Sequence, residues 1–112
     1  MSKHKIIIHR AHRRLELYEG TQRIRSYPIA VGKPSTPTPL GHYIIATKAM
    51  YPGGVFGSRW LGLSIPGYGI HGTNNPSSIG QAVSLGCIRM HNHDVENLFQ
   101  RVEIGTPVII QT

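Results

Sequence analysis

The sequence predicts a mostly β fold, a sandwich or barrel-like sheet with one capping helix near residues 92–102. Two observations favour this fold class: short apolar segments with the pattern of strands follow one another along the chain, and only one stretch has helical spacing. The 13 glycines and 8 prolines among the 112 residues mark many turns between these segments. The length predicts that residues 1–112 form a single domain.

Seven segments have the apolar pattern of strands: residues 5–9, 14–19, 22–31, 42–48, 60–64, 68–70 and 106–111. A turn around Gly20 joins the second and third segments into an expected hairpin. Because Pro28 has no N–H to donate to a neighbouring strand, we expect the third segment to lie at an edge or to be irregular.

The helix is expected to begin at Asn92, whose side chain would act as its N-cap, and Asp94 would lie in its first turn. Its apolar residues recur at helical spacing; they are Val95, Leu98, Phe99 and Val102. Gly105 follows as the residue that ends it.

Three loops separate the predicted elements: a proline-rich loop at 32–41, a glycine-rich loop at 49–58 and a long loop at 72–86. Loops as long as the last one are usually functional. In the glycine-rich loop Tyr51 and Phe56 are candidates for lining a cleft, because binding residues concentrate on loops. Trp60 is interpreted as a residue of the core or its rim.

The net charge of +7 favours a polyanionic partner or, equally, forms a solubilising surface. Nucleic acid is not expected as a partner, because aromatic residues make up only 7% of the chain and do not alternate with the basic ones. No membrane span and no signal peptide are predicted, since the N-terminal apolar run is three isoleucines long. Either the chain is not exported by that route or a leader has been removed.

The only cysteine, Cys87, lies in the stretch SLGCIRMHN and is the candidate nucleophile. Acyl transfer needs a nucleophile, a base and donors for the oxyanion. His71 precedes Gly72 and Cys87 follows Gly86, so each candidate adjoins a glycine that lets the backbone approach a substrate closely. The alternative is an inert buried cysteine, which is common in protein cores.

The segment from His71 to Ile110 resembles the active-site half of the L,D-transpeptidase (YkuD) family, whose pattern is His-Gly, a variable loop, and Ser/Thr-x-Gly-Cys followed by Arg. Cys87 follows His71 by 16 residues, which fits that pattern. The upstream GKPSTPTPLGHYII resembles the family's segment before a strand. The resemblance implies a β-sandwich with a capping helix and an enzyme that forms 3→3 cross-links on peptidoglycan tetrapeptide stems through a thioester.

The resemblance also implies roles for individual residues. Cys87 would be the nucleophile, His71 the base, and the Gly72 carbonyl the group that holds the imidazole. Backbone N–H groups of Gly86 and Cys87 would stabilise the oxyanion.

Three further positions match the family and would order the loop or bind a stem carboxylate: Ser84, Arg89 and Asn92, the last with the helix N-cap as its alternative role. The chain departs from many members at Leu85, where they have a second histidine.

No cofactor is implied. A zinc site formed by Cys87, His91 and His93 is not expected, because the usual ligand spacings are missing and a zinc-bound thiol would be a poor free nucleophile. The expected partners are peptidoglycan stem peptides, the expected location is the bacterial cell wall, and the expected state is a monomer. Two alternatives remain open: a non-catalytic wall-binding module, and an L,D-carboxypeptidase that uses water as the acceptor.

Overall fold

An eight-stranded sheet runs through the computed structural model, which describes residues 3–112, and its strand order is β3-β2-β1-β10-β5-β6-β7-β9. The strands are β1 (His4–His9), β2 (Arg14–Glu19), β3 (Gln22–Pro28), β5 (Gly41–Met50), β6 (Arg59–Leu63), β7 (Gly69–His71), β9 (Ile88–Arg89) and β10 (Pro107–Gln111). The hairpin of β2 and β3 is confirmed, and β3 is an edge strand, as Pro28 predicts.

The two ends of the sequence meet inside this sheet. β1 pairs in parallel with β10, and Ile6 and Ile8 lie opposite Val108 and Ile110. These four side chains are buried because alternate residues of both strands point to the same face. The pairing joins the N-terminal hairpins to the half of the sheet that carries β5, β6 and β7.

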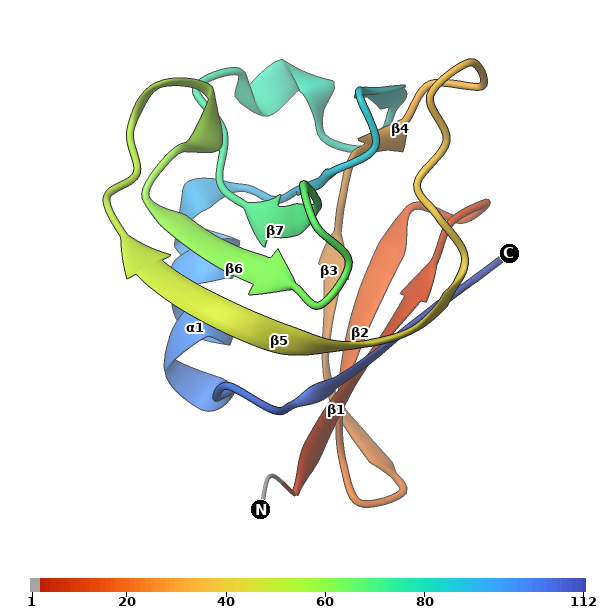
Figure 1. The fold of residues 1–112 in the computed structure, drawn as a ribbon, viewed down its shortest axis with the longest axis vertical. Helices are drawn as coiled ribbons and strands as arrows, with labels where there is room; N and C mark the ends of the chain where they lie inside the picture. Colours follow the sequence, from red (N-terminus) through yellow and green to blue (C-terminus); the bar gives the residue numbers. More distant parts are fainter. Residues whose placement is uncertain (1–2) are drawn as a thin grey trace.

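The sheet curls so that β5, β6 and β7 face β1, β2 and β3, with helix α1 (Asn92–Arg101) packed behind β6 and β7 (Figure 1). The core fills the space enclosed by the curl. Its largest fully buried side chains are Ile6, Ile8, Leu15, Leu17, Ile29, Ile45, Leu61, Ile70, Ile88, Met90, Leu98 and Val95. The predicted mostly β fold with one capping helix is therefore confirmed.

A second, two-stranded sheet pairs β4 (Val31–Gly32) in parallel with β8 (Ala82–Ser84). It differs from the prediction in two ways. The expected strand 22–31 is interrupted after Pro28, and β8 lies within the segment predicted as one long loop. Two 3-10 turns also form in the predicted loops, Gly54–Phe56 in the glycine-rich loop and Pro76–Ser78 in the long loop ahead of β8.

The expected capping role of Asn92 is wrong. The N-cap of α1 is His91, which makes no side-chain capping hydrogen bond, and Asn92 is the first helical residue. Its amide group is used elsewhere, as described below. The predicted helical spacing itself holds, since Val95 and Leu98 are fully buried.

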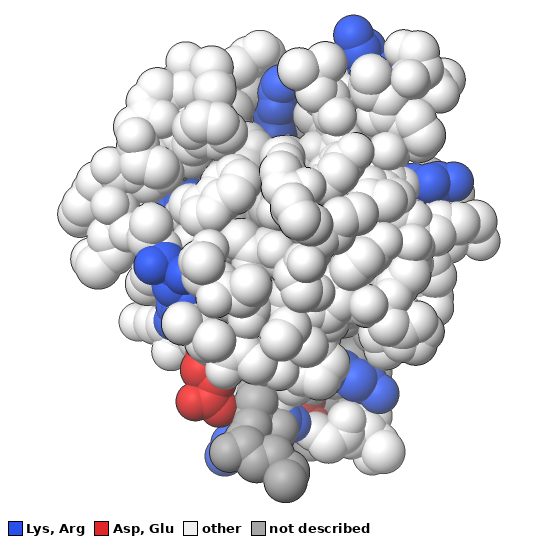
Figure 2. Space-filling model, viewed as in Figure 1, with Lys and Arg blue, Asp and Glu red and all other residues white. Residues whose placement is uncertain are grey.

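Basic side chains are scattered over the face shown in Figure 2, and the acidic side chains visible there lie only at its lower edge. The excess of positive charge is therefore spread over this face, not gathered into one patch. Among the described residues no helix is long and apolar enough to cross a membrane.

We predict that Lys48→Met lowers the free energy of unfolding by about 1–2 kcal/mol. The Lys48 ammonium donates to the carbonyl oxygens of Phe99 and Val102 at 2.6 and 2.8 Å, so it satisfies acceptors that the end of α1 leaves free. Urea denaturation of both proteins would measure the loss. Lys33→Met, at an exposed loop position, is the control and should change stability by less than about 0.5 kcal/mol. Equal losses in the two variants would contradict this role of Lys48.

Candidate active site

Three side chains form a row across neighbouring strands at one end of the sheet. Trp60 of β6 lies opposite His71 of β7, and His71 lies beside Arg89 of β9. The adjacent row consists of Leu61, Ile70 and Ile88, all fully buried in the core. Because successive residues of a strand point to opposite faces, the row that contains His71 points away from the core.

The His71 imidazole is held on several sides. Nδ1 lies 2.6 Å from the Gly72 carbonyl oxygen, so Nδ1 carries the proton and donates it, which leaves Nε2 as the acceptor of a neutral ring. The Trp60 ring stacks on the imidazole with centroids 5.7 Å apart, and the Phe56 ring contacts it edge-on at 5.1 Å.

His71 is only 3% exposed, and this burial lowers the pKa of its imidazole. The hydrogen bond to Gly72 acts in the opposite direction, and the Arg89 cation lowers the pKa further. Burial disfavours the charged ring, so His71 is neutral at neutral pH and can accept a proton.

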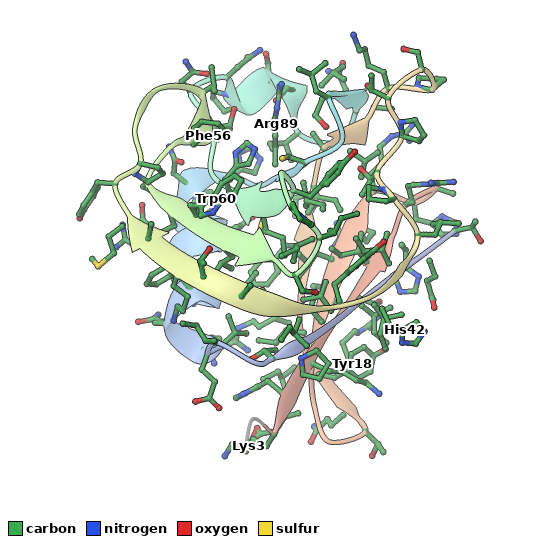
Figure 3. All side chains as sticks on the ribbon, in the orientation of Figure 1. Lys3, Tyr18, His42, Phe56, Trp60 and Arg89 are labelled. Atoms are coloured by element: carbon green, nitrogen blue, oxygen red, sulfur yellow. The ribbon has the colours of Figure 1, made fainter. Side chains whose placement is uncertain are left out.

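His71 and Cys87 line the same cavity, which has a volume of about 530 Å³. The other lining residues are Val55, Phe56, Trp60, Gly67, Tyr68, Ser84, Leu85 and Arg89. Figure 3 shows Phe56, Trp60 and Arg89 together at the upper end of the sheet, away from Lys3, Tyr18 and His42. The structure therefore brings the predicted nucleophile and base into one site.

The segment around Cys87 is fixed by side-chain hydrogen bonds to its backbone. The Ser84 hydroxyl donates to the Cys87 carbonyl oxygen at 2.6 Å and accepts from the Gly86 N–H at 3.0 Å. Gly86 has a φ of 124°, and a Cβ there would lie 2.6 Å from the Tyr68 ring, so only glycine fits. The Cys87 N–H makes no hydrogen bond within residues 3–112.

Burial raises the pKa of the Cys87 thiol. A hydrogen bond from the Gly69 backbone and the Arg89 cation both oppose this shift, but burial dominates. Since the pKa of His71 is lowered while that of Cys87 is raised, the two groups rest as thiol and neutral imidazole, not as an ion pair.

The Arg89 guanidinium is the only cation that lines this cavity. It makes no side-chain hydrogen bond or ion pair in the part of the chain that the structure describes, so its planar fork is available to an anion. Leu85, at the position where many family members have histidine, is 76% exposed at the mouth of the cavity.

Ser84 and Asn92, expected to order the loop or contact substrate, both use their polar atoms on backbone groups. The Asn92 Oδ1 accepts from the N–H groups of Ser58 and Thr73 at 3.2 and 3.1 Å, and its Nδ2 donates to the Thr73 carbonyl. A Cβ at Gly72 would lie 2.0 Å from this Oδ1, so the glycine leaves room for the amide. Asn92 thus joins the glycine-rich loop to the segment after His71.

Of the two loop aromatics predicted as cleft candidates, Phe56 lines the cavity. The Tyr51 ring lies against the Arg59 guanidinium and does not line the cavity. Trp60, interpreted as core or rim, stacks on His71. Because Leu61 is apolar and neighbours Trp60 in the strand, alternation could have indicated that the Trp60 side chain points away from the core. The pairing of β6 with β7, which places Trp60 beside His71, could not be predicted from the sequence.

His91 and His93 stack on each other with centroids 5.4 Å apart. Within residues 3–112 no group of three or more His, Cys, Asp or Glu side chains is placed to hold a metal ion.

The sequence matches the model of the YkuD family, described as the L,D-transpeptidase catalytic domain, over residues 3–110. The YkuD protein of Bacillus licheniformis is 58% identical over 98 residues, which cover 88% of this chain and 59% of that protein. Its Bacillus subtilis counterpart is 55% identical over 96 residues, covering 86% and 58%. The chain therefore spans less than three-fifths of the length of these relatives.

A solved structure of the catalytic domain of an E. faecium L,D-transpeptidase superposes with a TM-score of 0.83 at 26% identity. The match covers 99% of this chain and 98% of that one. The likeness thus extends over nearly the whole of both chains.

We predict that Asn92→Ala lowers the free energy of unfolding by about 1–3 kcal/mol, because it leaves the N–H of Thr73 without its partner in a buried position. Hydrogen exchange at Thr73 should quicken more than exchange in β1. The control is Asn74→Ala, which makes the same change at an exposed loop position. Asn97→Ala would be less suitable, because the Asn97 side chain accepts a hydrogen bond from the Tyr27 hydroxyl. Unchanged exchange at Thr73 would rule out the joining role.

We predict that the Cys87 thiol loses its proton at a higher pH than an ordinary cysteine thiol, because burial raises its pKa. Ultraviolet absorbance of the thiolate measures this directly, since the chain has one cysteine. Arg89→Met should move the transition to still higher pH, because the Arg89 cation favours the thiolate. A thiolate already present below pH 7 would instead indicate an ion pair with His71.

Proposed function

Because the chain belongs to the YkuD family of L,D-transpeptidase catalytic domains, we propose that it is a cysteine acyltransferase that forms 3→3 cross-links on peptidoglycan tetrapeptide stems. One observation carries the proposal: the only thiol of the chain shares a cavity with a buried neutral imidazole whose Nδ1 is already hydrogen-bonded. That arrangement provides a nucleophile together with a base that has one free acceptor nitrogen.

In the first step the Cys87 sulfur attacks the carbonyl carbon of the peptide bond before the terminal D-alanine. The Nε2 of His71 accepts the thiol proton as the carbon–sulfur bond forms. The same proton then passes to the leaving amine as the carbon–nitrogen bond breaks, which leaves a thioester on Cys87. The Gly72 carbonyl keeps the ring in the required tautomer and stabilises the imidazolium that forms transiently.

The Cys87 N–H is the proposed oxyanion donor. The Gly86 N–H was expected to share this role, but it already donates to the Ser84 hydroxyl, so we assign the role to Cys87 alone. Ser84 contributes indirectly, by holding the carbonyl of Cys87 and the N–H of Gly86.

In the second step an amine of a neighbouring stem attacks the thioester carbon. His71 takes a proton from that amine, the carbon–sulfur bond breaks, and the proton returns to the thiolate. Water as the acceptor would give L,D-carboxypeptidase activity by the same path. The exposed apolar side chains of Val55, Phe56 and Leu85 line the cavity and support the transferase, because apolar surroundings of the thioester disfavour water.

Arg89 is the proposed partner of a carboxylate of the stem. Its unpaired guanidinium in a cavity of mostly apolar lining favours an anion, and a bidentate carboxylate matches its geometry. The excess positive charge of the chain suits an anionic cell wall, which is the proposed place of action. A single catalytic domain and a monomeric state remain our proposals for its organisation.

We predict that incubation with a carbapenem adds the mass of one inhibitor to the protein, because a thiol opens the strained ring and stays acylated. Intact-mass spectrometry would follow the adduct over time. Cys87→Ala should show no adduct, and His71→Ala should form it at least about 100-fold more slowly, as expected for loss of a general base.

Leu85→His is a matched control, since it restores the side chain common in the family and leaves Cys87 and His71 in place. It should acylate at least as fast as the unmodified protein. If the folded unmodified protein forms no adduct, the acyltransferase proposal fails, and a wall-binding module whose binding survives Cys87→Ala becomes the better explanation.

A further inference from the structure

We propose that Thr38 is a positioning residue: its hydroxyl fixes the peptide between Gly86 and Cys87 so that the Cys87 N–H points into the cleft as the oxyanion donor. This inference rests on the proposed function, since an oxyanion donor has a task only in an acyl transfer. Thr38 lies in the proline-rich loop, far from Cys87 in the sequence, and does not line the cavity.

The Thr38 side chain is fully buried and makes two hydrogen bonds. Its Oγ1 accepts from the Gly32 N–H at 2.9 Å and lies 2.9 Å from the Gly86 carbonyl oxygen. Because a hydroxyl has one proton and a carbonyl oxygen can only accept, that proton is donated to Gly86. The direction of both bonds is therefore determined.

The Gly86 carbonyl and the Cys87 N–H belong to one peptide unit. In a planar trans peptide the C=O and N–H bonds point in opposite directions, and this chain has no cis peptide in its described part. Holding the carbonyl against Thr38 therefore turns the N–H of Cys87 to the other side, away from the proline-rich loop.

Every other backbone polar group of these two residues already has a partner. Ser84 takes the Gly86 N–H and the Cys87 carbonyl, and Thr38 takes the Gly86 carbonyl. Only the Cys87 N–H is left without a hydrogen bond among the described residues. Because no protein group in the described residues pairs with it, this N–H is available to a ligand in the cavity that Cys87 lines.

The loop that carries Thr38 is stiff. Pro37 and Pro39 flank it; the first has a fixed φ, and the second restricts Thr38 itself to extended conformations. The Arg10 guanidinium donates to the Thr38 carbonyl oxygen at 2.7 Å. In Figure 1 this loop follows β4 at the end of the molecule where β8 leads into the Cys87 segment. The hydroxyl is thus fixed within its own loop, and that loop is also bonded to the Cys87 segment through the Thr36 hydroxyl, which donates to the Ser84 carbonyl oxygen at 2.9 Å.

The test compares two reactions of Cys87 that differ in whether an oxyanion forms. Acylation by a carbapenem develops an oxyanion, whereas alkylation by iodoacetamide does not. We expect Thr38→Val to slow acylation about tenfold or more, since loss of an oxyanion donor costs about 100-fold or more and here the donor is misdirected, not deleted. Alkylation at the same pH should change by less than about twofold, because it needs only the thiolate.

Thr38→Ser keeps the hydroxyl and should acylate at close to the unmodified rate. Thr21→Val makes the same chemical change at an exposed turn position and should leave both rates unchanged. Thr38→Ala is the second deletion variant, because it removes the hydroxyl without placing a methyl group against the Gly86 carbonyl. Thermal unfolding of each variant shows whether it is folded at the assay temperature.

Equal acylation rates in Thr38→Val and the unmodified protein would overturn the positioning role. So would a parallel fall of acylation and alkylation, or loss of folding in both deletion variants, because each would make the hydroxyl a structural element only. Failure of the unmodified protein to acylate would instead overturn the proposed function, so the two failures are distinguishable.

Discussion

Burial of the His71 imidazole is the constraint around which the site is arranged. Burial disfavours the charged form of the imidazole, and each nitrogen of the neutral ring then needs a hydrogen-bonding role. The Gly72 carbonyl takes the Nδ1 proton, while Trp60 and Phe56 enclose the ring faces and edges. The Arg89 cation on the neighbouring strand disfavours a second positive charge still further. What is left is one acceptor nitrogen in a cavity that also contains the thiol.

The need to fix backbone groups explains the small polar side chains found around Cys87. The proposed mechanism uses two backbone groups, the Gly72 carbonyl that holds the His71 ring and the Cys87 N–H that faces the substrate, and these are fixed only if their peptides are fixed. The side chains of Ser84, Thr38 and Asn92 each form hydrogen bonds with backbone groups of the loops around the cavity. None of the three replaces a catalytic group, but each removes a freedom of the backbone next to one.

Many of the strands, the helix and the cavity residues around Cys87 could be predicted from the sequence, because each depends on residues close together in the chain. Alternation of apolar residues predicted most strands, helical spacing predicted α1, and the motif around Cys87 predicted the residues of the site. The features that the sequence did not predict depend on residues far apart in the chain. The parallel pairing of β1 with β10 joins the two ends of the chain, and two-residue strands such as β9 have no pattern of their own. Asn92 was misread as a cap because its true partners, Ser58 and Thr73, come from distant loops.

Thr38 illustrates the same limit from the opposite side. Its loop reads as a connection because prolines break every apolar period, and nothing local indicates that one hydroxyl is bonded to Gly86, 48 residues further along the chain. Yet the prolines that hide the role also make it possible, since a flexible loop would lose conformational entropy each time it oriented the peptide. A rigid connection on one side and a glycine with a φ of 124° on the other leave the Cys87 N–H a single direction. The stiff proline-rich loop and the positive φ that only glycine readily adopts at Gly86 therefore act together to orient the Cys87 N–H.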